Sequence, residues 1–197
     1  MKIDKSFYEQ YMSAFIAQNA KVNLISKNDE KFLWEKHIFD SLAVGKVFEK
    51  YGTPATLLDI GTGGGFPAVP VALAYPEIEV YALDSIRKKI NAIENIKAEL
   101  DIKNLHTICE RAEKITDKFD MVTSRAVAPL KVITEYAMPR LNKNGIFVAY
   151  KSVKTQEEIN EASVVLKKYN AKVADIMEYK LPLDENHTRN LIVIINE

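Results

Sequence analysis

The chain has 197 residues, 47% of them apolar and 27% charged, so its length and composition predict one soluble globular domain. Lysine plus arginine and aspartate plus glutamate number 27 each, so no overall basic charge points to a nucleic-acid partner, although a local basic patch can act alone. The single cysteine, Cys109, excludes an intrachain disulfide and is typical of the reducing cytoplasm. No apolar run could span a membrane, and the N-terminus lacks the apolar core of a signal peptide.

The first part of the chain, residues 1–52, is predicted to form a helical cap. Two helical stretches are expected near Asp29–Lys36 and Ile38–Tyr51. Before them, apolar side chains recur at helical spacing, at Phe7, Tyr8, Tyr11, Met12, Phe15 and Ile16. We interpret this stripe as core that packs on the rest of the protein, so that the cap and residues 53–197 form one structural unit.

Residues 53–197 alternate between strand-like and helix-like segments, which is typical of an α/β fold with a mostly parallel sheet and helices on both faces. The predicted strands are Thr56–Ile60, Glu79–Leu83, Leu105–Cys109, Phe119–Thr123, Gly145–Tyr150, Lys172–Glu178 and Leu191–Ile195. The predicted helices are Pro67–Tyr75, Ser85–Leu100, Leu130–Leu141 and Thr155–Tyr169.

The first predicted strand runs directly into a glycine-rich turn, Gly61-Thr62-Gly63-Gly64-Gly65. Glycine accepts positive φ and lets a ligand approach the backbone closely. Pro67 is suited to the first turn of the helix that follows. This arrangement predicts that a cofactor lies against the main chain.

Three classes of nucleotide site could use such a turn. A P-loop is excluded because no Lys follows the glycines. A dinucleotide site fits Gly63, Gly65 and Ala68 in the Gly-x-Gly-x-x-Gly/Ala pattern. S-adenosylmethionine (SAM) needs a carboxylate at the tip of the next strand for the ribose, and Asp84 fits that role, although a dinucleotide would use the same acid. Asp59, just before the glycines, favours SAM, but the residues alone leave both cofactors open.

From Asn23 onward the chain resembles one family, the bacterial rRNA small-subunit guanine-N7 methyltransferases, also called glucose-inhibited division protein B. The resemblance rests on the order and spacing of several short motifs. They are Asn23-Leu24-Ile25-Ser26, Lys36-His37-Ile38-Phe39-Asp40-Ser41, the glycine turn through Phe66-Pro67, Leu83-Asp84-Ser85, Glu110-Arg111-Ala112-Glu113, Ser124-Arg125-Ala126 and Tyr150-Lys151. The family commonly has Pro where this chain has Gly64, and Leu-Pro-Gly where it has Phe66-Pro67-Ala68.

The resemblance implies a Rossmann-like class I SAM-dependent methyltransferase fold, with a seven-stranded sheet and an N-terminal helical cap. It implies methyl transfer from SAM to N7 of a guanine in 16S rRNA. Because the net charge is zero, we expect weak binding to bare RNA, and a partly or fully assembled small ribosomal subunit is the expected substrate. The predicted SAM-binding residues, from the resemblance and the sheet-edge argument together, are Asp59, Gly61, Gly63, Gly65, Phe66, Asp84, Ser85, Ala112, Glu113 and Arg125. Arg125 could equally hold a substrate phosphate.

The predicted contacts with RNA are His37, Arg125, Lys151, Arg87 and Lys88. Lys151 is the strongest of them because it ends the fifth strand, on the ligand-binding edge of the sheet. His37 and Asp40 lie three residues apart, which suits either a structural contact between cap and sheet or a place in the substrate cleft. Further candidate phosphate binders are Lys89, Lys131, Arg140 and Lys154.

Methylation of guanine N7 requires no general base, because N7 carries a lone pair and no proton, so none is predicted. Three histidines and one cysteine without paired spacing do not predict a metal site. Three other functions remain compatible with the glycine turn. They are a SAM-dependent enzyme for a small molecule, an NAD(P)-dependent oxidoreductase, and a SAM-sensing or assembly module without turnover.

Overall fold

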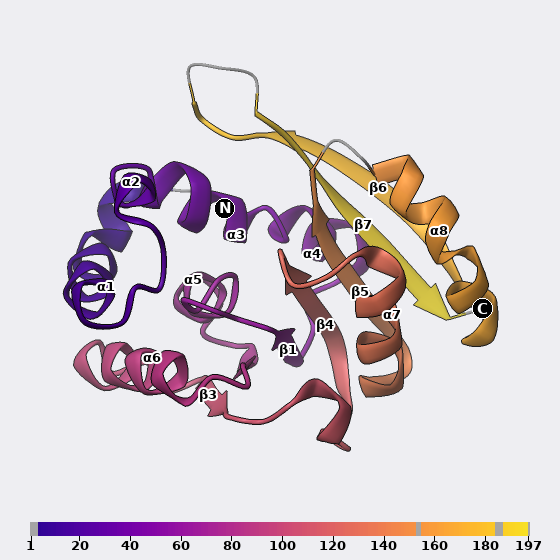
Figure 1. Ribbon diagram of the computed structural model, residues 1–197, viewed down its shortest axis with the longest axis horizontal. Coiled ribbons are helices and arrows are strands. Elements are labelled where there is room, and N and C mark those ends of the chain that lie inside the picture. The colour runs from indigo at the N-terminus through magenta and orange to yellow at the C-terminus, as the bar shows by residue number, and fades with distance from the viewer. Residues whose placement is uncertain (1–3, 153–154, 184–186, 197) are drawn as a thin grey trace.

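The computed structural model describes residues 4–152, 155–183 and 187–196. Its centre is a seven-stranded sheet in the order β3-β2-β1-β4-β5-β7-β6 (Figure 1). Strands β1 to β5 are parallel, whereas β7 runs antiparallel to both β5 and β6, so the predicted mostly parallel sheet is confirmed. The strands are β1 (Thr56–Ile60), β2 (Glu79–Leu83), β3 (Leu105–Ile108), β4 (Phe119–Arg125), β5 (Leu141–Lys151), β6 (Ala171–Lys180) and β7 (Thr188–Asn196).

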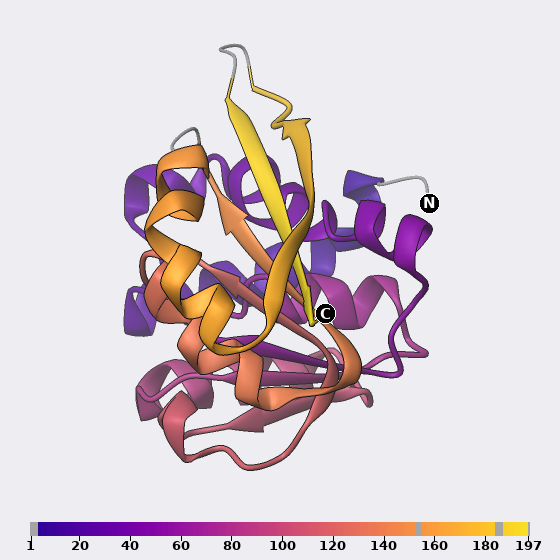
Figure 2. The ribbon, with the colours of Figure 1, turned by 90° about the vertical axis from the view of Figure 1, so that its right-hand side faces the viewer.

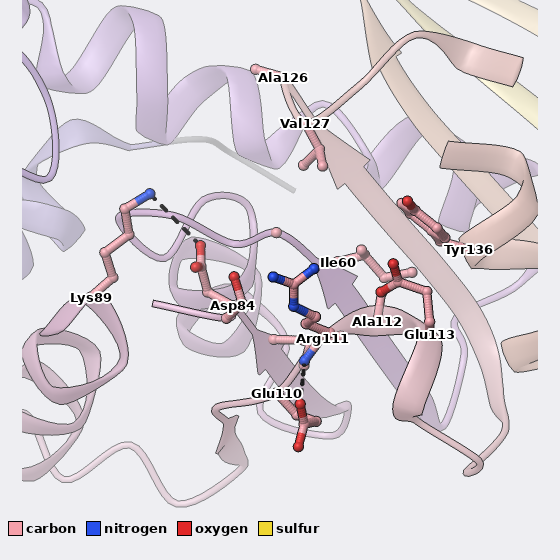
Figure 3. A pocket seen from close by; sticks show the side chains of 13 residues that line it. Ile60, Asp84, Lys89, Glu110, Arg111, Ala112, Glu113, Ala126, Val127 and Tyr136 are labelled. Carbon is pink, nitrogen blue, oxygen red and sulfur yellow. Dashed lines mark hydrogen bonds and ion pairs between the residues drawn. The ribbon is translucent and has the colours of Figure 1, made fainter. Parts of the chain in front are cut away.

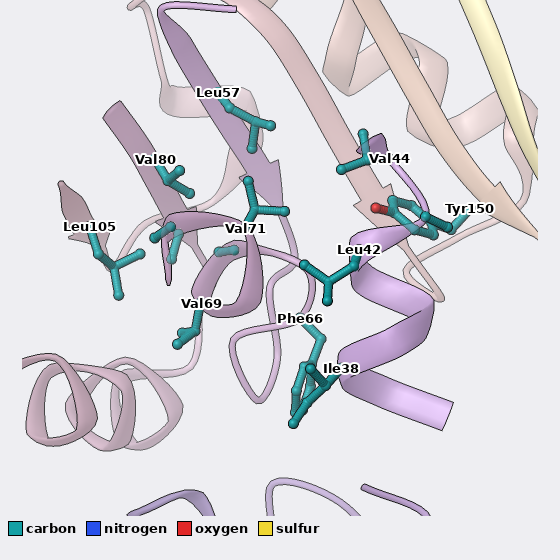
Figure 4. Close-up of a cluster of buried hydrophobic side chains, with 14 of the residues drawn as sticks. Ile38, Leu42, Val44, Leu57, Phe66, Val69, Val71, Val80, Leu105 and Tyr150 are labelled. Atoms are coloured by element: carbon teal, nitrogen blue, oxygen red, sulfur yellow. The ribbon is translucent and has the colours of Figure 1, made fainter. Parts of the chain in front are cut away.

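Helices cover both faces of the sheet, as predicted. Neighbouring residues of a strand point to opposite faces. Leu57 therefore joins the buried cluster of the face that carries the cap, whereas Leu58 joins the cluster of the other face. The first cluster includes Val71 and Leu42 and is shown in Figure 4. On the cap side lie α5 (Ala68–Ala74) and α6 (Arg87–Glu99), and on the other side lie α7 (Leu130–Ala137) and α8 (Thr155–Lys168).

The helical cap is present, but its two later helices are broken into shorter pieces than the sequence predicts. A left-handed Asn23 ends the first helix, and Ser26 caps the next. A turn separates that helix from a π-helical segment that buries Leu33, Trp34 and Ile38. The elements are a 3-10 turn (Lys5–Tyr8), α1 (Glu9–Val22), α2 (Lys27–Glu30), the π-helical segment (Leu33–Ile38), α3 (Phe39–Leu42) and α4 (Gly45–Tyr51).

The cap packs tightly on the sheet and its helices. Phe15 of α1 lies 5.0 Å from Phe66, ring centre to ring centre, and Gln18 of α1 accepts a hydrogen bond from Asn95 of α6 at 3.1 Å. Cap and sheet residues belong to one buried cluster. In the part of the chain that the structure describes, no helix has the length and apolar character needed to cross a membrane.

Two boundaries differ from the prediction in ways that affect the site. Strand β4 continues to Arg125, because Arg125 pairs with Tyr150 of β5, so Arg125 ends the strand rather than following it. Pro67 was expected inside the first turn of α5. It instead precedes that helix, after a cis bond to Phe66, and its carbonyl accepts the amide of Val71.

Candidate functional site

The glycine-rich turn folds over the end of β2. The amides of Gly61 and Thr62 both donate to the carbonyl of Leu83, at 2.8 and 2.9 Å. Gly61 has a φ of +71°, and a Cβ there would overlap the side chain of Val127. Glycine is therefore required at position 61 both by the backbone angle and by the close approach of another loop.

Asp84 follows β2 directly and holds this turn in place. One carboxylate oxygen accepts from the amide of Gly63 at 3.0 Å, and the other accepts from the amide of Ile86 at 2.9 Å. Lys89 lies 3.9 Å from the same carboxylate. The side chain is nearly buried, yet it lines an open pocket, so a ligand there can reach the carboxylate (Figure 3).

We call this cavity the Asp84 pocket; it has a volume of 390 Å³ and lies at the carboxyl edge of the sheet. Its walls come from the ends of β1 and β2, from the segment after β3, and from the loop after β4 (Figure 3). Five of the predicted SAM-binding residues line it, namely Gly61, Asp84, Ser85, Ala112 and Glu113. Ligand sites in open α/β sheets lie at this edge, and the volume is in the range of small-molecule sites.

The other five predicted SAM-binding residues lie around the pocket rather than on its walls. They are Asp59, Gly63, Gly65, Phe66 and Arg125. Asp59 is fully buried behind the turn, where it accepts from Thr123 at 3.0 Å. Burial raises the pKa of its carboxyl to about 6, although the hydrogen bond from Thr123 opposes that rise. Asp59 is therefore a core residue behind the glycine turn and does not line the pocket.

Arg125 ends β4 on the far side of the turn, and the chain itself holds its guanidinium. Nη1 donates to Asp40 Oδ2 at 2.7 Å and to the Lys36 carbonyl at 3.1 Å, while Nη2 lies 3.2 Å from Nδ1 of His37. The guanidinium also lies 5.2 Å from the centre of the Phe66 ring. Arg125 thus joins the cap, the sheet and the glycine turn.

His37 and Asp40 are both brought to Arg125, so they tie the cap to the sheet and also line a cleft. Asp40 is buried and accepts a second hydrogen bond, from the Tyr179 hydroxyl at 2.6 Å. Burial, with help from the nearby Arg125 charge, lowers the pKa of His37 to about 4. The imidazole is therefore neutral near pH 7.

These residues line a second cavity, which we call the Arg125 pocket. Its volume is 530 Å³, and Lys36, Lys151 and Glu158 also lie on its walls. The Asp84 pocket and the Arg125 pocket meet at Ala126, which lines both. The site therefore consists of two adjoining cavities with the end of β4 between them.

Lys151 lies at the end of β5 on the wall of the Arg125 pocket, but its ammonium is already engaged. It forms an ion pair with Glu158 of α8 at 2.6 Å and donates to the Ala128 carbonyl at 2.9 Å. Glu158 also accepts from the amide of Leu130, at the start of α7. The pair thus fixes the loop between Ala126 and Leu130.

The other basic candidates are spread around the site. Arg87 and Lys88 are exposed at the start of α6, outside the walls of both pockets. Lys89 lines the Asp84 pocket, and Lys131 lies near Glu161 on the surface. Arg140 is buried and donates to the Glu113 carbonyl at 2.7 Å, so it supports the pocket wall. Lys154 lies outside the described residues.

Several wall residues were not among the site residues predicted from the sequence. In the Asp84 pocket they include Arg111, Val127 and Tyr136, and in the Arg125 pocket they include His187 and Arg189. Arg111 follows β3 at the ligand edge, so the sheet-edge rule could have found it. Among the described residues, no group of three or more His, Cys, Asp or Glu side chains could hold a metal ion.

The sequence comparisons decide the family. The model of the family described as rRNA small subunit methyltransferase G matches residues 4–191. The chain belongs to this family. The ribosomal RNA small subunit methyltransferase G of Staphylococcus aureus is 33% identical over 194 residues, which cover 96% of this chain and 81% of that protein. The protein of the same name from Bacillus subtilis is 32% identical over 193 residues, 95% of this chain and 80% of its own length.

Solved structures are similar in fold alone. A ribosomal protein L11 methylase from Lactobacillus delbrueckii subsp. bulgaricus has a TM-score of 0.61 at 19% identity, over 79% of this chain and 77% of that chain. P. horikoshii TYW2, in complex with MeSAdo, has a TM-score of 0.62 at 15% identity, over 81% of this chain and 62% of that chain. These likenesses confirm the predicted Rossmann-like methyltransferase fold.

The family decides between the two cofactors that the glycine turn allows. Membership in a methyltransferase family confirms the prediction of a SAM-dependent enzyme and leaves the oxidoreductase reading without support. The donor set of the Asp84 pocket fits SAM, because the Asp84 carboxylate lies beside the glycine turn, within reach of a ligand in the pocket.

Proposed function

We propose that this protein transfers the methyl group of SAM to N7 of a guanine in the 16S rRNA of the small ribosomal subunit. The observation that carries the proposal is the junction at Ala126, where the Asp84 pocket opens beside the Arg125 pocket. A methyl donor in the first cavity and a base in the second would meet there. Family membership supports rRNA as the class of acceptor.

In this proposal the Asp84 pocket holds SAM. Asp84 would accept from the ribose hydroxyls of SAM, and Gly61 would allow the cofactor to approach the backbone closely. Ser85, Ala112 and Glu113 form the remaining wall. Behind them, buried side chains and the other glycines give the turn its shape, at Asp59, Gly63, Gly65 and Phe66. When bound, SAM supplies a methyl group that its sulfonium has already activated.

The chain's own contribution to catalysis is alignment. Guanine N7 has no proton to lose, so positioning the base beside the donor supplies most of the rate gain. Arg125, clamped by Asp40 and His37, forms a rigid wall of the acceptor cavity. Because His37 is neutral, it does not repel the positive charge that guanine gains on methylation.

The substrate form we propose is a partly or fully assembled small subunit in the cytoplasm. The protein has 27 basic and 27 acidic side chains, so electrostatic attraction to bare RNA is weak. Shape and ribosomal protein would supply the remaining affinity. We also propose that the cap, residues 1–52, and residues 53–197 act as one structural unit, because they share the core around Phe66.

The test compares methyl transfer from labelled SAM to three acceptors. They are bare 16S rRNA, assembled small subunits from cells that lack this gene, and metabolite extract. We expect transfer to a single guanine N7 of the subunit RNA, faster on subunits than on bare RNA. Equal rates on both RNA substrates would refute the preference for subunits. Transfer to the extract alone would refute the rRNA function.

A further inference from the structure

Arg189 lies at the ligand-binding edge of the sheet because β7 runs against the parallel strands. In an antiparallel strand the first residues, and not the last, reach that edge. Asn190 of β7 pairs with Lys151, the last residue of β5, and Arg189 is one position further out. On its other side Arg189 pairs with Tyr179 of β6. It therefore stands beside the ends of the strands that build the site.

The side chain of Arg189 faces the Arg125 pocket. Residues two apart on a strand share a face. Leu191 and Val193 are buried in the cluster on the cap side, and Arg189 lies on the same face. At its position the core gives way to the Arg125 pocket, and Arg189 is one of the wall residues.

Charge pairing separates Arg189 from the other cations of that pocket. Four cationic side chains, of lysine or arginine, line it, and three of them face a carboxylate of the same pocket. The pairs are Lys36 with Asp29 at 3.2 Å, Arg125 with Asp40 at 2.7 Å, and Lys151 with Glu158 at 2.6 Å. Within the described part of the chain, Arg189 forms no such pair.

Most N–H donors of the Arg189 guanidinium have no partner in the part of the chain that the structure describes. Among the described residues, its guanidinium has one hydrogen bond, from Nη1 to the Thr188 carbonyl at 3.3 Å, whereas a guanidinium carries five N–H donors. A phosphate that approached Lys36 or Lys151 would have to compete with the carboxylate already there. At Arg189 it would meet a charge that no described carboxylate pairs with, in the fork geometry that suits phosphate oxygens.

We propose that Arg189 binds a backbone phosphate of the RNA substrate next to the target guanine. This inference rests on the proposed function, because it takes rRNA as the acceptor. Figures 1 and 2 show that the β6–β7 hairpin extends past the body of the sheet. Arg189 is the second residue of β7, close to the end of the hairpin where β6 connects to β7. Lys180, exposed at the end of β6, pairs with Thr188 next to it and adds positive charge to the same arm.

The test uses Arg189→Ala with a matched control, Lys143→Ala. Lys143 is an exposed cation near the start of β5, at the opposite edge of the sheet. Binding of small subunits and of a 16S rRNA fragment is measured from low to moderate salt. We expect R189A to weaken binding roughly tenfold at low salt. The slope of log K against log salt should shrink by about 0.7 to 0.9, the contribution of one phosphate contact.

Steady-state kinetics and SAM titration distinguish a loss of RNA binding from a loss of SAM binding or of turnover. R189A should raise KM for the RNA substrate and leave kcat and SAM affinity unchanged, and unchanged SAM affinity also shows that the variant is folded. Arg189→Lys should restore part of the salt slope, and K143A should match the wild type. A wild-type salt slope and KM in R189A, with an active wild-type enzyme, would overturn this inference alone. A wild-type protein that methylates no small-subunit RNA would overturn the proposed function itself.

Discussion

The guanidinium of Arg125 and the carboxylate of Asp40 form an ion pair of 2.7 Å that joins the end of β4 to the N-terminal cap. Both side chains are largely buried, with exposed fractions of 15% and 6%. The Tyr179 hydroxyl, from β6, donates to the other oxygen of the same carboxylate. One buried aspartate thus connects three distant parts of the chain at the wall of the acceptor cavity.

Asp40→Asn should destabilise the protein strongly. Removing one partner of a buried ion pair leaves the other charge without compensation, which costs about 3–5 kcal/mol. The free energy of unfolding, measured with urea, should fall by an amount in that range. Methyl transfer should fall further than SAM binding, since the Asp84 pocket does not include Asp40.

Asp29→Asn is the matched control. Asp29 lines the same pocket and pairs with Lys36, but both side chains are about one-third exposed. Exposed pairs contribute between about 0 and 1 kcal/mol. Equal losses of stability in the two variants would contradict the structural role assigned to the Arg125–Asp40 pair.

Asp84→Asn should weaken SAM binding about 10- to 100-fold, because it removes a charged acceptor from the pocket wall. Isothermal titration with SAM measures the effect directly. The exposed Asp101→Asn, in the turn after α6, should bind SAM as the wild type does. Unchanged affinity in D84N would remove Asp84 from the proposed cofactor site.

Lys151 and Glu158 should act as a unit that holds the loop from Ala126 to Leu130. Lys151→Ala and Glu158→Ala should each lower kcat, and the double variant should be little worse than either single one, since contacting residues are not additive. RNA affinity should change little. The control is the exposed pair of Lys168 and Glu135, which also joins α7 to α8.

The same variants also test whether Lys151 contacts RNA directly. If Lys151 contacts RNA directly, K151A will raise KM and reduce the salt dependence of binding while E158A will not. That outcome would contradict the structural role that its two contacts indicate.

Asp59→Asn should change how stability depends on pH. Burial raises the pKa of Asp59 from 3.8 to about 6 in the folded protein, so the folded state holds a proton more tightly than the unfolded state. Its contribution to stability is therefore full below pH 3.8 and is lost as the pH rises through 6. D59N lacks this titration, so its stability relative to the wild type should rise by roughly 3 kcal/mol between pH 4 and pH 7.

Urea unfolding of both proteins across this pH range gives the difference. His37 titrates in both proteins, so its contribution to stability cancels from the difference between D59N and the wild type. Asp120→Asn is the control. Burial raises the pKa of Asp120, but hydrogen bonds from Asn142 and Thr56 outweigh that and lower it, so its titration lies below pH 4. A difference between D59N and wild type that is flat from pH 4 to 7 would contradict the assignment.

Local patterns in the sequence were sufficient to predict much of the fold and part of the candidate site. The run from Thr56 to Ile60 and the glycines after it predicted a strand and a turn, because both depend on neighbouring residues. Asp84 could be placed beside Gly63 because parallel strands end at one edge of the sheet. The family motifs predicted the methyltransferase, which the comparisons confirmed.

Other features depended on contacts between different elements. The sequence does not show that Glu158, at the start of α8, would turn back to neutralise Lys151, or that Asp40 would hold Arg125 from 85 residues away. The importance of Arg189 depends on the direction of β7. The rule that ligands bind at the ends of strands applies to parallel strands. It therefore did not predict Arg189, which lies at the start of an antiparallel strand.

The sequence by itself therefore determined the order of the elements, the glycine turn with its acidic partner, and the family. Each of these follows from residues close together in the chain or from motifs in a set order. Only the tertiary structure decided which cations of the Arg125 pocket face a carboxylate and which one has no such partner among the described residues. Ion pairing depends on distances of a few ångströms between side chains from different elements, and the packing of the cap and the antiparallel hairpin on the sheet sets those distances.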